Sequence, residues 1–324
     1  MSGPEATPPD EVDPPDEFGQ IARLFRPLTR GAPEALELLD DAAVIPSRPG
    51  FDLVVTKDAL VAGVHFQPDE PPDRIARRLL RANLSDLAAK AAAPFGYFLM
   101  TAWPPGFDWS QRQAFAEGLR EDGATFDVSL LGGDTVATPG PLTVSMTLLG
   151  WVSAGQMIRR AGARPGDLVM VSGPIGDGWL DWGPGAGQLD RRWLAEPYRL
   201  PNPRLDLRDL LRSHASAAAD ISDGLIADAG HVARASGVSM TLDLDRMPIS
   251  AAAEAWLATQ ADRAGGLLRL ATGGDDYELL LTAPPETATR LGLPVIGEVQ
   301  AGQGVIARAG GRDLDGGAGG WRHR

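Results

Sequence analysis

The stretch Val54–Phe66, with the sequence V-V-T-K-D-A-L-V-A-G-V-H-F, constrains the fold more than any other part of the chain. Its apolar start predicts a buried strand. Asp58 is expected just past the end of that strand, and His65 follows after a short turn that contains Gly63. A carboxylate at a strand end can hold a metal ion, and an imidazole a few residues later can contact a substrate. We therefore expect the other acidic motifs to be partners of this stretch.

The length and composition limit what the chain can be. Its 324 residues, of which 44% are hydrophobic, are enough for two domains with packed cores. The chain contains no Cys, which excludes disulfides, thiolate metal sites and a Cys nucleophile, and its four His residues lack the spacing of a zinc site. The net charge of −13 argues against nucleic acid and anionic membranes as partners. No apolar run reaches the length of a membrane span, and the acidic, Pro-rich start is unlike a signal peptide, so a cytoplasmic location is expected.

Strands and helices are predicted to alternate along two units. Residues 1–16 have the composition of a disordered tail, 17–152 form the first domain and 153–324 the second. Helices are predicted at 18–25, 73–92, 111–122, 205–213, 223–236, 251–260 and 286–291. Strands are predicted at 52–56, 97–103, 129–131, 142–152, 168–172, 240–244, 278–282, 295–299 and 304–308. Hairpin-like connections indicate mixed or antiparallel sheets, so the predicted fold class is α+β.

Asp residues recur beside Gly, Ser or Thr where elements are expected to end. The motifs are L-D-D-A at 39–42, T-K-D at 56–58, N-L-S-D at 83–86, G-G-D-T at 132–135, D-I-S-D-G at 220–224 and G-G-D-D at 273–276. Each motif alone is typical of a cap or a turn. Asp86 is different, because it falls inside the helical pattern of 73–92, near its apolar side. Together the motifs predict a carboxylate-rich metal site, with Mg²⁺ preferred over Mn²⁺ or Ca²⁺.

Several other residues could contact a polyphosphate held by such metals. Gly132-Gly133 would let the backbone approach a ligand closely, and Ser222 at a predicted helix start could bind an anion or simply cap the helix. Arg159-Arg160 could reach a phosphate or be an ordinary surface pair. His65 could be a core histidine and Trp321 a packing residue rather than substrate contacts. The sequence has no P-loop and no protein-kinase catalytic loop.

Seven motifs that occur together and in order identify a family. They are D-D-A-A-V at 40–44, T-K-D-A-L-V-A-G-V-H-F at 56–66, N-L-S-D-L-A-A at 83–89, L-G-G-D-T at 131–135, R-A-G-A-R-P-G-D at 160–167, D-I-S-D-G-L at 220–225 and G-G-D-D-Y-E-L at 273–279. Over residues 17–324 the sequence resembles the thiamine-monophosphate kinases of the aminoimidazole ribonucleotide synthetase-like superfamily. The resemblance implies a homodimer formed through the sheet of the N-terminal domain, and a ferredoxin-like core in the C-terminal domain. It also implies ATP-dependent phosphorylation of thiamine monophosphate to thiamine diphosphate with several Mg²⁺ ions.

The resemblance also implies roles for individual residues. The implied metal ligands are Asp41, Thr56, Lys57, Asp58, Asp86, Asp134, Asp220 and Asp223, of which Asp86 and Asp134 are the implied catalytic residues. The implied ATP contacts are Gly133, Asp134, Arg160 and Ser222, and the implied contacts to thiamine monophosphate are His65, Asp275 and Trp321. The chain departs from the family pattern at Leu39, Lys57 and Asp275, where the family usually has Gly, Thr and Glu.

Two alternatives remain open from the sequence. One is another ATP-using enzyme of the same superfamily; the types that need a Cys are disfavoured, because the chain has none. The other is a nucleotide- or metal-binding regulator that has lost catalysis, which the departures at Lys57 and Asp275 motivate.

Overall fold

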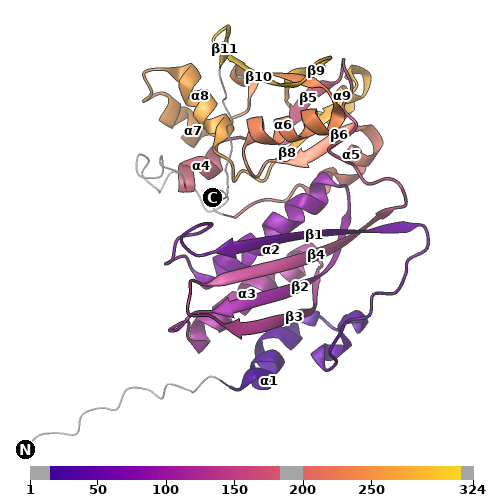
Figure 1. The fold of residues 1–324 in the computed structure, drawn as a ribbon, viewed down its shortest axis with the longest axis vertical. Coiled ribbons are helices and arrows are strands. Elements are labelled where there is room, and N and C mark those ends of the chain that lie inside the picture. Colours follow the sequence, from indigo (N-terminus) through magenta and orange to yellow (C-terminus); the bar gives the residue numbers. More distant parts are fainter. Residues whose placement is uncertain (1–14, 183–199, 315–324) are drawn as a thin grey trace, which may run out of the picture.

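The computed structural model describes residues 15–182 and 200–314. It consists of two α+β units, one above the other in Figure 1, and the chain passes from the first to the second between Ser153 and Leu168. Within these described ranges, no helix is both long enough and apolar enough to cross a membrane.

The N-terminal unit is built on a mixed four-stranded sheet. Its strands lie in the order β1-β4-β2-β3, with β2 and β3 parallel and the other pairs antiparallel. Their bounds are β1 Phe51–Val61, β2 Ala93–Trp103, β3 Ser129–Ala137 and β4 Thr143–Ser153. Helices α2 (Pro72–Ala89) and α3 (Trp109–Phe126) cover one face, which leaves the other face open toward the viewer in Figure 1. Short helical segments pack beside the β3 edge: α1 Glu17–Gln20, η1 Ile21–Phe25, η2 Arg26–Thr29 and η3 Pro33–Leu38.

Helix α2 follows the apolar spacing of its sequence. Ile75, Leu79, Leu80, Leu84 and Leu87 are at most 2% exposed, and they recur at the three- and four-residue intervals that place side chains on one face of a helix. The helix ends at Ala89 rather than at the expected Ala92. A buried apolar face explains why this prediction is nearly right, whereas the exact end is decided by local turn geometry.

The strand that contains Asp58 differs from its prediction. β1 is an edge strand, and its side chains alternate between the α2 side and the open side, so Val55 is 56% exposed whereas Val54 is buried. Asp58 lies within β1, not past its end. Because successive side chains of a strand point to opposite faces of the sheet, Thr56 and Asp58 lie on the α2 side and Lys57 lies on the open side.

The G-G-D-T motif is also part of a strand rather than of a loop. β3 continues through Gly132-Gly133-Asp134-Thr135 to Ala137. A Cβ atom on Gly133 would overlap the carbonyl oxygen of Leu99 in β2. The close approach of the two paired strands therefore requires a glycine at position 133, whether or not Gly133 also contacts a ligand.

The C-terminal unit contains a mixed seven-stranded sheet in the order β11-β10-β7-β9-β5-β8-β6. Its strands are β5 Leu168–Val171, β6 Ala217–Asp220, β7 Ser239–Asp243, β8 Leu279–Ala283, β9 Val295–Gln300, β10 Gly304–Ala309 and β11 Arg312–Leu314. Its helical segments are α4 Asp177–Trp182, η6 Leu205–Leu207, α5 Arg208–His214, α6 Leu225–Ser236, η7 Leu244–Arg246, α7 Ala251–Leu257, α8 Arg263–Thr272 and α9 Pro285–Leu291. Mixed sheets in both units confirm the α+β class.

The start of α6 differs from its prediction, whereas its end agrees. The helix begins at Leu225, and Ser222 makes no side-chain cap. Instead, Asp228 Oδ2 accepts hydrogen bonds from the backbone N–H groups of Ser222, Asp223 and Gly224, at 3.1, 3.1 and 3.2 Å. Gly237 ends the helix in the left-handed conformation, as expected from its position.

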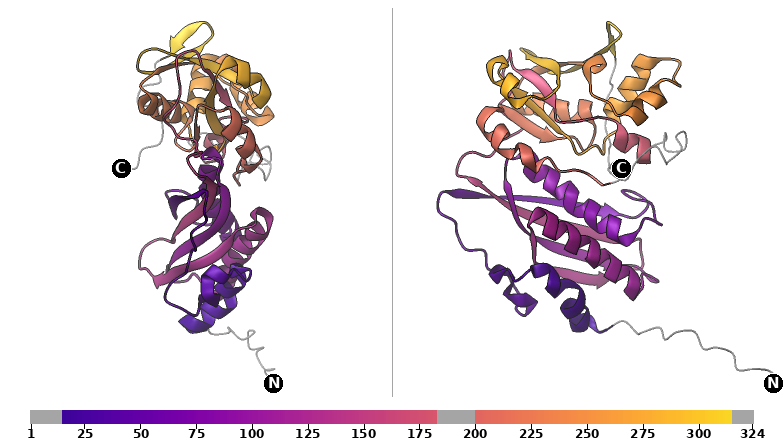
Figure 2. Two further views of the ribbon diagram at one scale, coloured as in Figure 1. Left: turned by 90° about the vertical axis from the view of Figure 1, so that its right-hand side faces the viewer. Right: turned by 180° about the vertical axis from the view of Figure 1, so that it is seen from behind.

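Helix α2 joins the two units. Ala88 and Ala89 at its end belong to the same buried cluster as Met170, Ala218 and Leu281 of the C-terminal sheet. Lys90 Nζ donates to the carbonyl oxygen of Ala218 at 2.9 Å. The helix thus lies between the two sheets, and Figure 2 shows it at the junction seen from behind.

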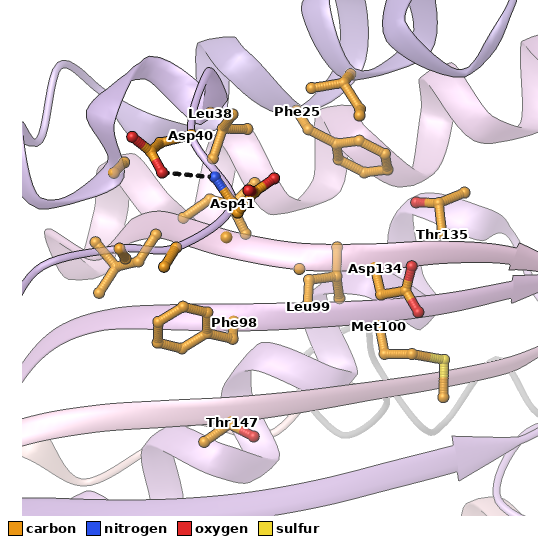
Figure 3. A pocket seen from close by; sticks show the side chains of 18 of the residues that line it. Phe25, Leu38, Asp40, Asp41, Phe98, Leu99, Met100, Asp134, Thr135 and Thr147 are labelled. Carbon is orange, nitrogen blue, oxygen red and sulfur yellow. Dashed lines mark hydrogen bonds between the residues drawn. The ribbon is translucent and has the colours of Figure 1, made fainter.

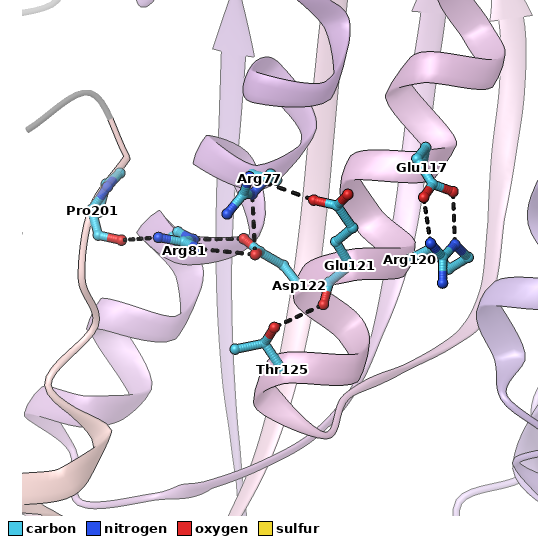
Figure 4. Close-up of polar contacts among 8 residues, drawn as sticks. All are labelled: Arg77, Arg81, Glu117, Arg120, Glu121, Asp122, Thr125 and Pro201. Atoms are coloured by element: carbon cyan, nitrogen blue, oxygen red, sulfur yellow. Dashed lines mark hydrogen bonds and ion pairs between the residues drawn. The ribbon is translucent and has the colours of Figure 1, made fainter. Parts of the chain in front are cut away.

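A buried carboxylate ties α2 to α3. Asp122 is 1% exposed and accepts from Arg81 through both oxygens, at 2.6 and 2.9 Å, and from Arg77 at 3.2 Å (Figure 4). Arg81 also donates to the carbonyl oxygen of Pro201 at 3.2 Å, so the network reaches a segment that enters the C-terminal unit. The pairing compensates a charge that would be costly to bury alone.

We predict that Asp122→Ala lowers the free energy of unfolding by about 3 kcal/mol, because two arginines lose their buried partner. Urea unfolding at neutral pH measures the change. Glu117→Ala is the matched control, since it removes a carboxylate from the same helix that pairs with Arg120 at the surface, and it should change little. Equal effects of the two substitutions would contradict the role of Asp122.

Candidate active site

Three of the predicted carboxylates come together where α2 meets the C-terminal unit. Asp58 comes from β1, Asp86 from α2 and Asp220 from the end of β6. The hydroxyl of Thr56 donates to Asp86 Oδ2. We call Asp58, Asp86 and Asp220 the carboxylate cluster.

The charges of the carboxylate cluster act on one another. Burial, and after it the charge of Asp86, raises the pKa of Asp58 to about 6. The same two causes, in the same order, raise the pKa of Asp220 well above its usual value, although the nearby Lys90 opposes the shift. Buried acids that repel one another favour a bound cation. Because the donors are carboxylate and hydroxyl oxygens, the cluster fits a hard divalent ion such as Mg²⁺.

A second group lies at the start of α6. Carboxylate oxygens of Asp223 and Asp228 and a ring nitrogen of His231 lie within 4.8 Å of one another, close enough to hold a metal ion. Burial lowers the pKa of His231, and the charge of Arg160 adds to the shift. The charge of Arg160 also contributes to lowering the pKa of Lys90, after burial, and opposes the raised pKa of Asp228, so this predicted nucleotide contact acts on residues of both regions. The Ser222 N–H is already bonded to Asp228.

The loop that contains Asp275 joins the same region from the C-terminal unit. Asp275 has a left-handed backbone, with φ of 68°, and its N–H donates to the carbonyl oxygen of Ser222 at 2.8 Å. Its side chain forms an ion pair with Arg78 of α2. Burial raises the pKa of Tyr277, and the charges of Asp275, Asp58 and Asp220 raise it further. Tyr277 therefore experiences the charges of both Asp275 and the carboxylate cluster.

Other predicted residues lie on the open face of the N-terminal sheet. A cavity of about 490 Å³ is lined by Asp41, Lys57, Gly133 and Asp134, together with apolar side chains of Phe25, Phe98 and Met100. Figure 3 shows Asp41 and Asp134 on its wall. Asp134 shares its side of the sheet with Met100, its neighbour in β2, and is thus on the opposite side from Asp58. The structure therefore divides the predicted metal ligands between two faces of one sheet.

Two of the predicted substrate contacts remain, His65 and Trp321. His65 follows β1 in the turn at Gly63, and its Nδ1 accepts from the backbone N–H of Val61 at 3.0 Å. This bond leaves the proton on Nε2 in the neutral ring. Trp321 is outside the described residues.

Sequence reasoning missed four residues that shape the site: Arg78, Lys90, Asp228 and Tyr277. Tyr277 is part of the G-G-D-D-Y-E-L motif, which was a usable signal. Asp228 lies beyond the D-I-S-D-G-L motif, and only the folded loop shows that it holds the N–H groups of that motif. Arg78 and Lys90 look like ordinary surface charges of a helix until the second unit packs on them.

Comparison with known proteins places the chain in a family. The model for the N-terminal domain of AIR synthase related proteins matches residues 39–152, and the model for their C-terminal domain matches residues 164–310. The thiamine-monophosphate kinase of Caulobacter vibrioides is 56% identical over 326 residues, which cover 96% of this chain and 91% of that protein. The chain belongs to the thiamine-monophosphate kinase family. The family member of Salmonella typhimurium is 36% identical, covering 83% of this chain and 82% of its own.

Solved structures of the thiamine-monophosphate kinase family share the fold. The enzyme of Stenotrophomonas maltophilia superposes with a TM-score of 0.78 at 36% identity, over 92% of this chain and 98% of that one. AaThiL complexed with AMPPCP and TMP superposes with a TM-score of 0.77 at 27% identity, over 95% of this chain and 97% of that one.

We predict that Asp86→Asn reduces turnover at least about a hundredfold, comparable to the loss of a strong electrostatic stabiliser. Without divalent cations the variant should melt at a higher temperature than the wild type, because the charge of Asp86 contributes to the raised pKa values of Asp58 and Asp220. Asp58, whose pKa is raised from 3.8 to about 6, loses folding free energy as pH rises through that range. The part of the gain that comes from Asp58 should therefore be small at pH 4 and complete near pH 7.

Turnover at limiting Mg²⁺ and thermal unfolding in chelator measure the two effects of Asp86→Asn. Asp69→Asn is the control, since it removes the same charge from an exposed loop residue outside the cluster. Near-normal turnover of Asp86→Asn at limiting Mg²⁺ would contradict the assignment of Asp86 as a metal ligand.

Proposed function

We propose that the chain transfers the γ-phosphoryl group of ATP to thiamine monophosphate and so forms thiamine diphosphate. The observation that carries the proposal is the 56% identity to a thiamine-monophosphate kinase over nearly the whole chain. AaThiL complexed with AMPPCP and TMP supports the two substrates, because AMPPCP is an ATP analogue. A need for ATP also fits the cytoplasmic location expected from the sequence.

ATP is proposed to occupy the cavity on the open face. Its volume of about 490 Å³ suits a small ligand, and Phe25, Phe98 and Met100 offer apolar surface for a base. Lys57 lines the cavity and is adjacent in β1 to Asp58. Because β1 is an edge strand, phosphates that pass Lys57 can reach the carboxylate cluster around that edge. Arg160 and Ser222 are the proposed contacts from the C-terminal unit, and Gly133 and Asp134 those from β3.

Mg²⁺ ions are proposed to sit between the carboxylates and the phosphates. Thr56, Asp58, Asp86 and Asp220 would hold them on the α2 side, Asp223 at the start of α6, and Asp41, Lys57 and Asp134 on the open side. When bound, Mg²⁺ neutralises phosphate charge and aligns the transferred group. Thr56 keeps Asp86 oriented through its hydrogen bond. Asp86 and Asp134 are the proposed catalytic residues, since they would act on the reacting phosphates.

Thiamine monophosphate is proposed to bind on the C-terminal side of the carboxylate cluster. Asp275 would face its positive charge, His65 would donate from Nε2, and Trp321 remains a prediction from the sequence. A phosphate monoester is already largely dianionic at pH 7, so its oxygen can attack directly. The site then needs no strong general base, and Tyr277, whose pKa burial raises, stays protonated.

The direct assay mixes the protein with γ-labelled ATP, Mg²⁺ and thiamine monophosphate. Label should appear in thiamine diphosphate as ADP is released, and incubation without the acceptor should leave no label on the denatured protein, since the transfer is direct. Nucleotide binding with no ADP release would favour the alternative of a regulator that has lost catalysis. Stoichiometric label on the protein would require a phosphoenzyme.

We further propose that the open face of the N-terminal sheet is covered by a second copy of the chain. Phe51, Leu53 and Val55 of β1 and Val136 of β3 are exposed on that face, and apolar side chains gathered on a surface favour an interaction site. Two further expectations belong to the same proposal: the division at residues 152 and 153, which the sequence pattern predicts, and the ferredoxin-like core, which the resemblance implies.

A charge on this face tests the proposed dimer. Val55→Glu should convert the protein to a monomer in analytical ultracentrifugation, because a carboxylate at an apolar interface loses its hydration without a partner. Glu298→Gln, on the C-terminal sheet, is the control and should leave the mass unchanged. A wild-type protein that sediments as a monomer would disprove the proposal.

A further inference from the structure

The carboxylate proposed to face the acceptor already has a partner. Asp275, in the C-terminal unit, forms an ion pair with Arg78 of α2, in the N-terminal unit. The two side chains are 24% and 14% exposed, so the pair is largely shielded from water. The guanidinium carbon of Arg78 lies 5.9 Å from the centre of the Tyr277 ring, on the face of which a cation is favoured. A positive charge thus occupies the place where a cationic substrate would be recognised.

Arg78 and Asp86 lie at two ends of one helical face. Eight residues separate them, which is about 12 Å along a helix. Between them Ser85 donates to the carbonyl oxygen of Tyr277 at 3.3 Å, so this face of α2 packs along the Asp275 loop. An acceptor whose phosphate is at Asp86 would therefore extend its ring system toward Arg78 and Asp275.

Hydrogen bonds hold the backbone of the loop that contains Asp275 and Tyr277. The N–H groups of Asp275 and Tyr277 donate to the carbonyl oxygens of Ser222 and Ile221, both at 2.8 Å. A Cβ atom on Gly178 would overlap the carbonyl group of Asp275, so the start of α4 is packed against the backbone of Asp275. Any exchange of partners at Asp275 must then come from the long, jointed side chain of Arg78.

We propose that Arg78 is a displaceable counter-ion, which the permanent positive charge of the thiazolium ring replaces at Asp275 when the acceptor binds. The inference rests on the proposed function. A buried carboxylate without a cation is costly, so a neutral ring cannot take the place of the guanidinium at equal cost. Arg78 thereby makes the site selective for a cationic heterocycle, because any other ligand would have to displace the guanidinium without supplying a positive charge to Asp275. Arg78 also weakens acceptor binding, since only those protein molecules in which Asp275 is not paired with Arg78 can bind the acceptor.

The test removes the competing charge. Arg78→Met keeps the length of the side chain and should lower the KM for thiamine monophosphate about three- to tenfold, with the KM for ATP within about twofold. Calorimetry should show the same fall in the dissociation constant of thiamine, which carries the thiazolium but no phosphate. Arg77→Met is the matched control, because it removes the same charge from the neighbouring position, where the partners are Glu121 and Asp122. In an Asp275→Asn background, Arg78→Met should lose its effect.

Other outcomes would overturn the inference. A higher KM for thiamine monophosphate with unchanged thiamine affinity would mean that Arg78 binds the phosphate. An equal change in Arg77→Met would mean a general charge effect, and no change in either constant would mean that Arg78 only packs. If Arg78→Met does not fold, Arg78→Gln answers the same question. Failure of the proposed function is seen separately, as a wild type that binds thiamine without phosphorylating its monophosphate.

Discussion

The repulsion among Asp58, Asp86 and Asp220 is the constraint on which the rest of the structure depends. These acids come from three elements of two units, and burial, together with the charge of Asp86, raises the pKa of Asp58 and of Asp220. Such an arrangement costs folding free energy unless a cation shares the space. The fold tolerates that cost because α2 is firmly held on both sides: by the Asp122 network toward α3 and by Ala88 and Ala89 toward the C-terminal sheet. The packing of α2 thus offsets the unfavourable free energy of the carboxylate cluster when no cation is bound. Such local destabilisation is common at binding and catalytic sites.

Features that follow from a periodic sequence pattern could be predicted, whereas features that depend on tertiary contacts could not. Helix α2 was predictable because its buried leucines recur with the helical period. β6 was missed because Ala217, Ala218 and Ala219 have little preference for strands, and only complete burial between α2 and β8 makes them one. The type of chemistry was predictable from carboxylates without Cys. The family was predictable from ordered motifs, since the motifs lie where the elements meet.

The distribution of the site over two faces could not be predicted. Thr56, Lys57 and Asp58 are consecutive, and a sequence motif says nothing about strand alternation until the extent of the strand is known. The expected end of the strand at Leu131 was wrong for a similar reason, because the strand continues through Gly132 and Gly133 and Gly133 permits the close approach of β2. Arg78 gave no signal at all. Its partner Asp275 is 197 residues away in the chain, and only the packing of the second unit brings the two charges together.

Helix α2 belongs to two hydrophobic cores at once: its first turns pack in the core of the N-terminal unit and its last turn in that of the C-terminal sheet. Separating the two sheets would therefore expose apolar side chains at one end of α2. The two units are thermodynamically a single cooperative block, even though each has its own sheet. The chain cannot be cut into two autonomous halves at the boundary that its topology suggests, and a half expressed alone would carry either an uncovered helix end or an uncovered sheet.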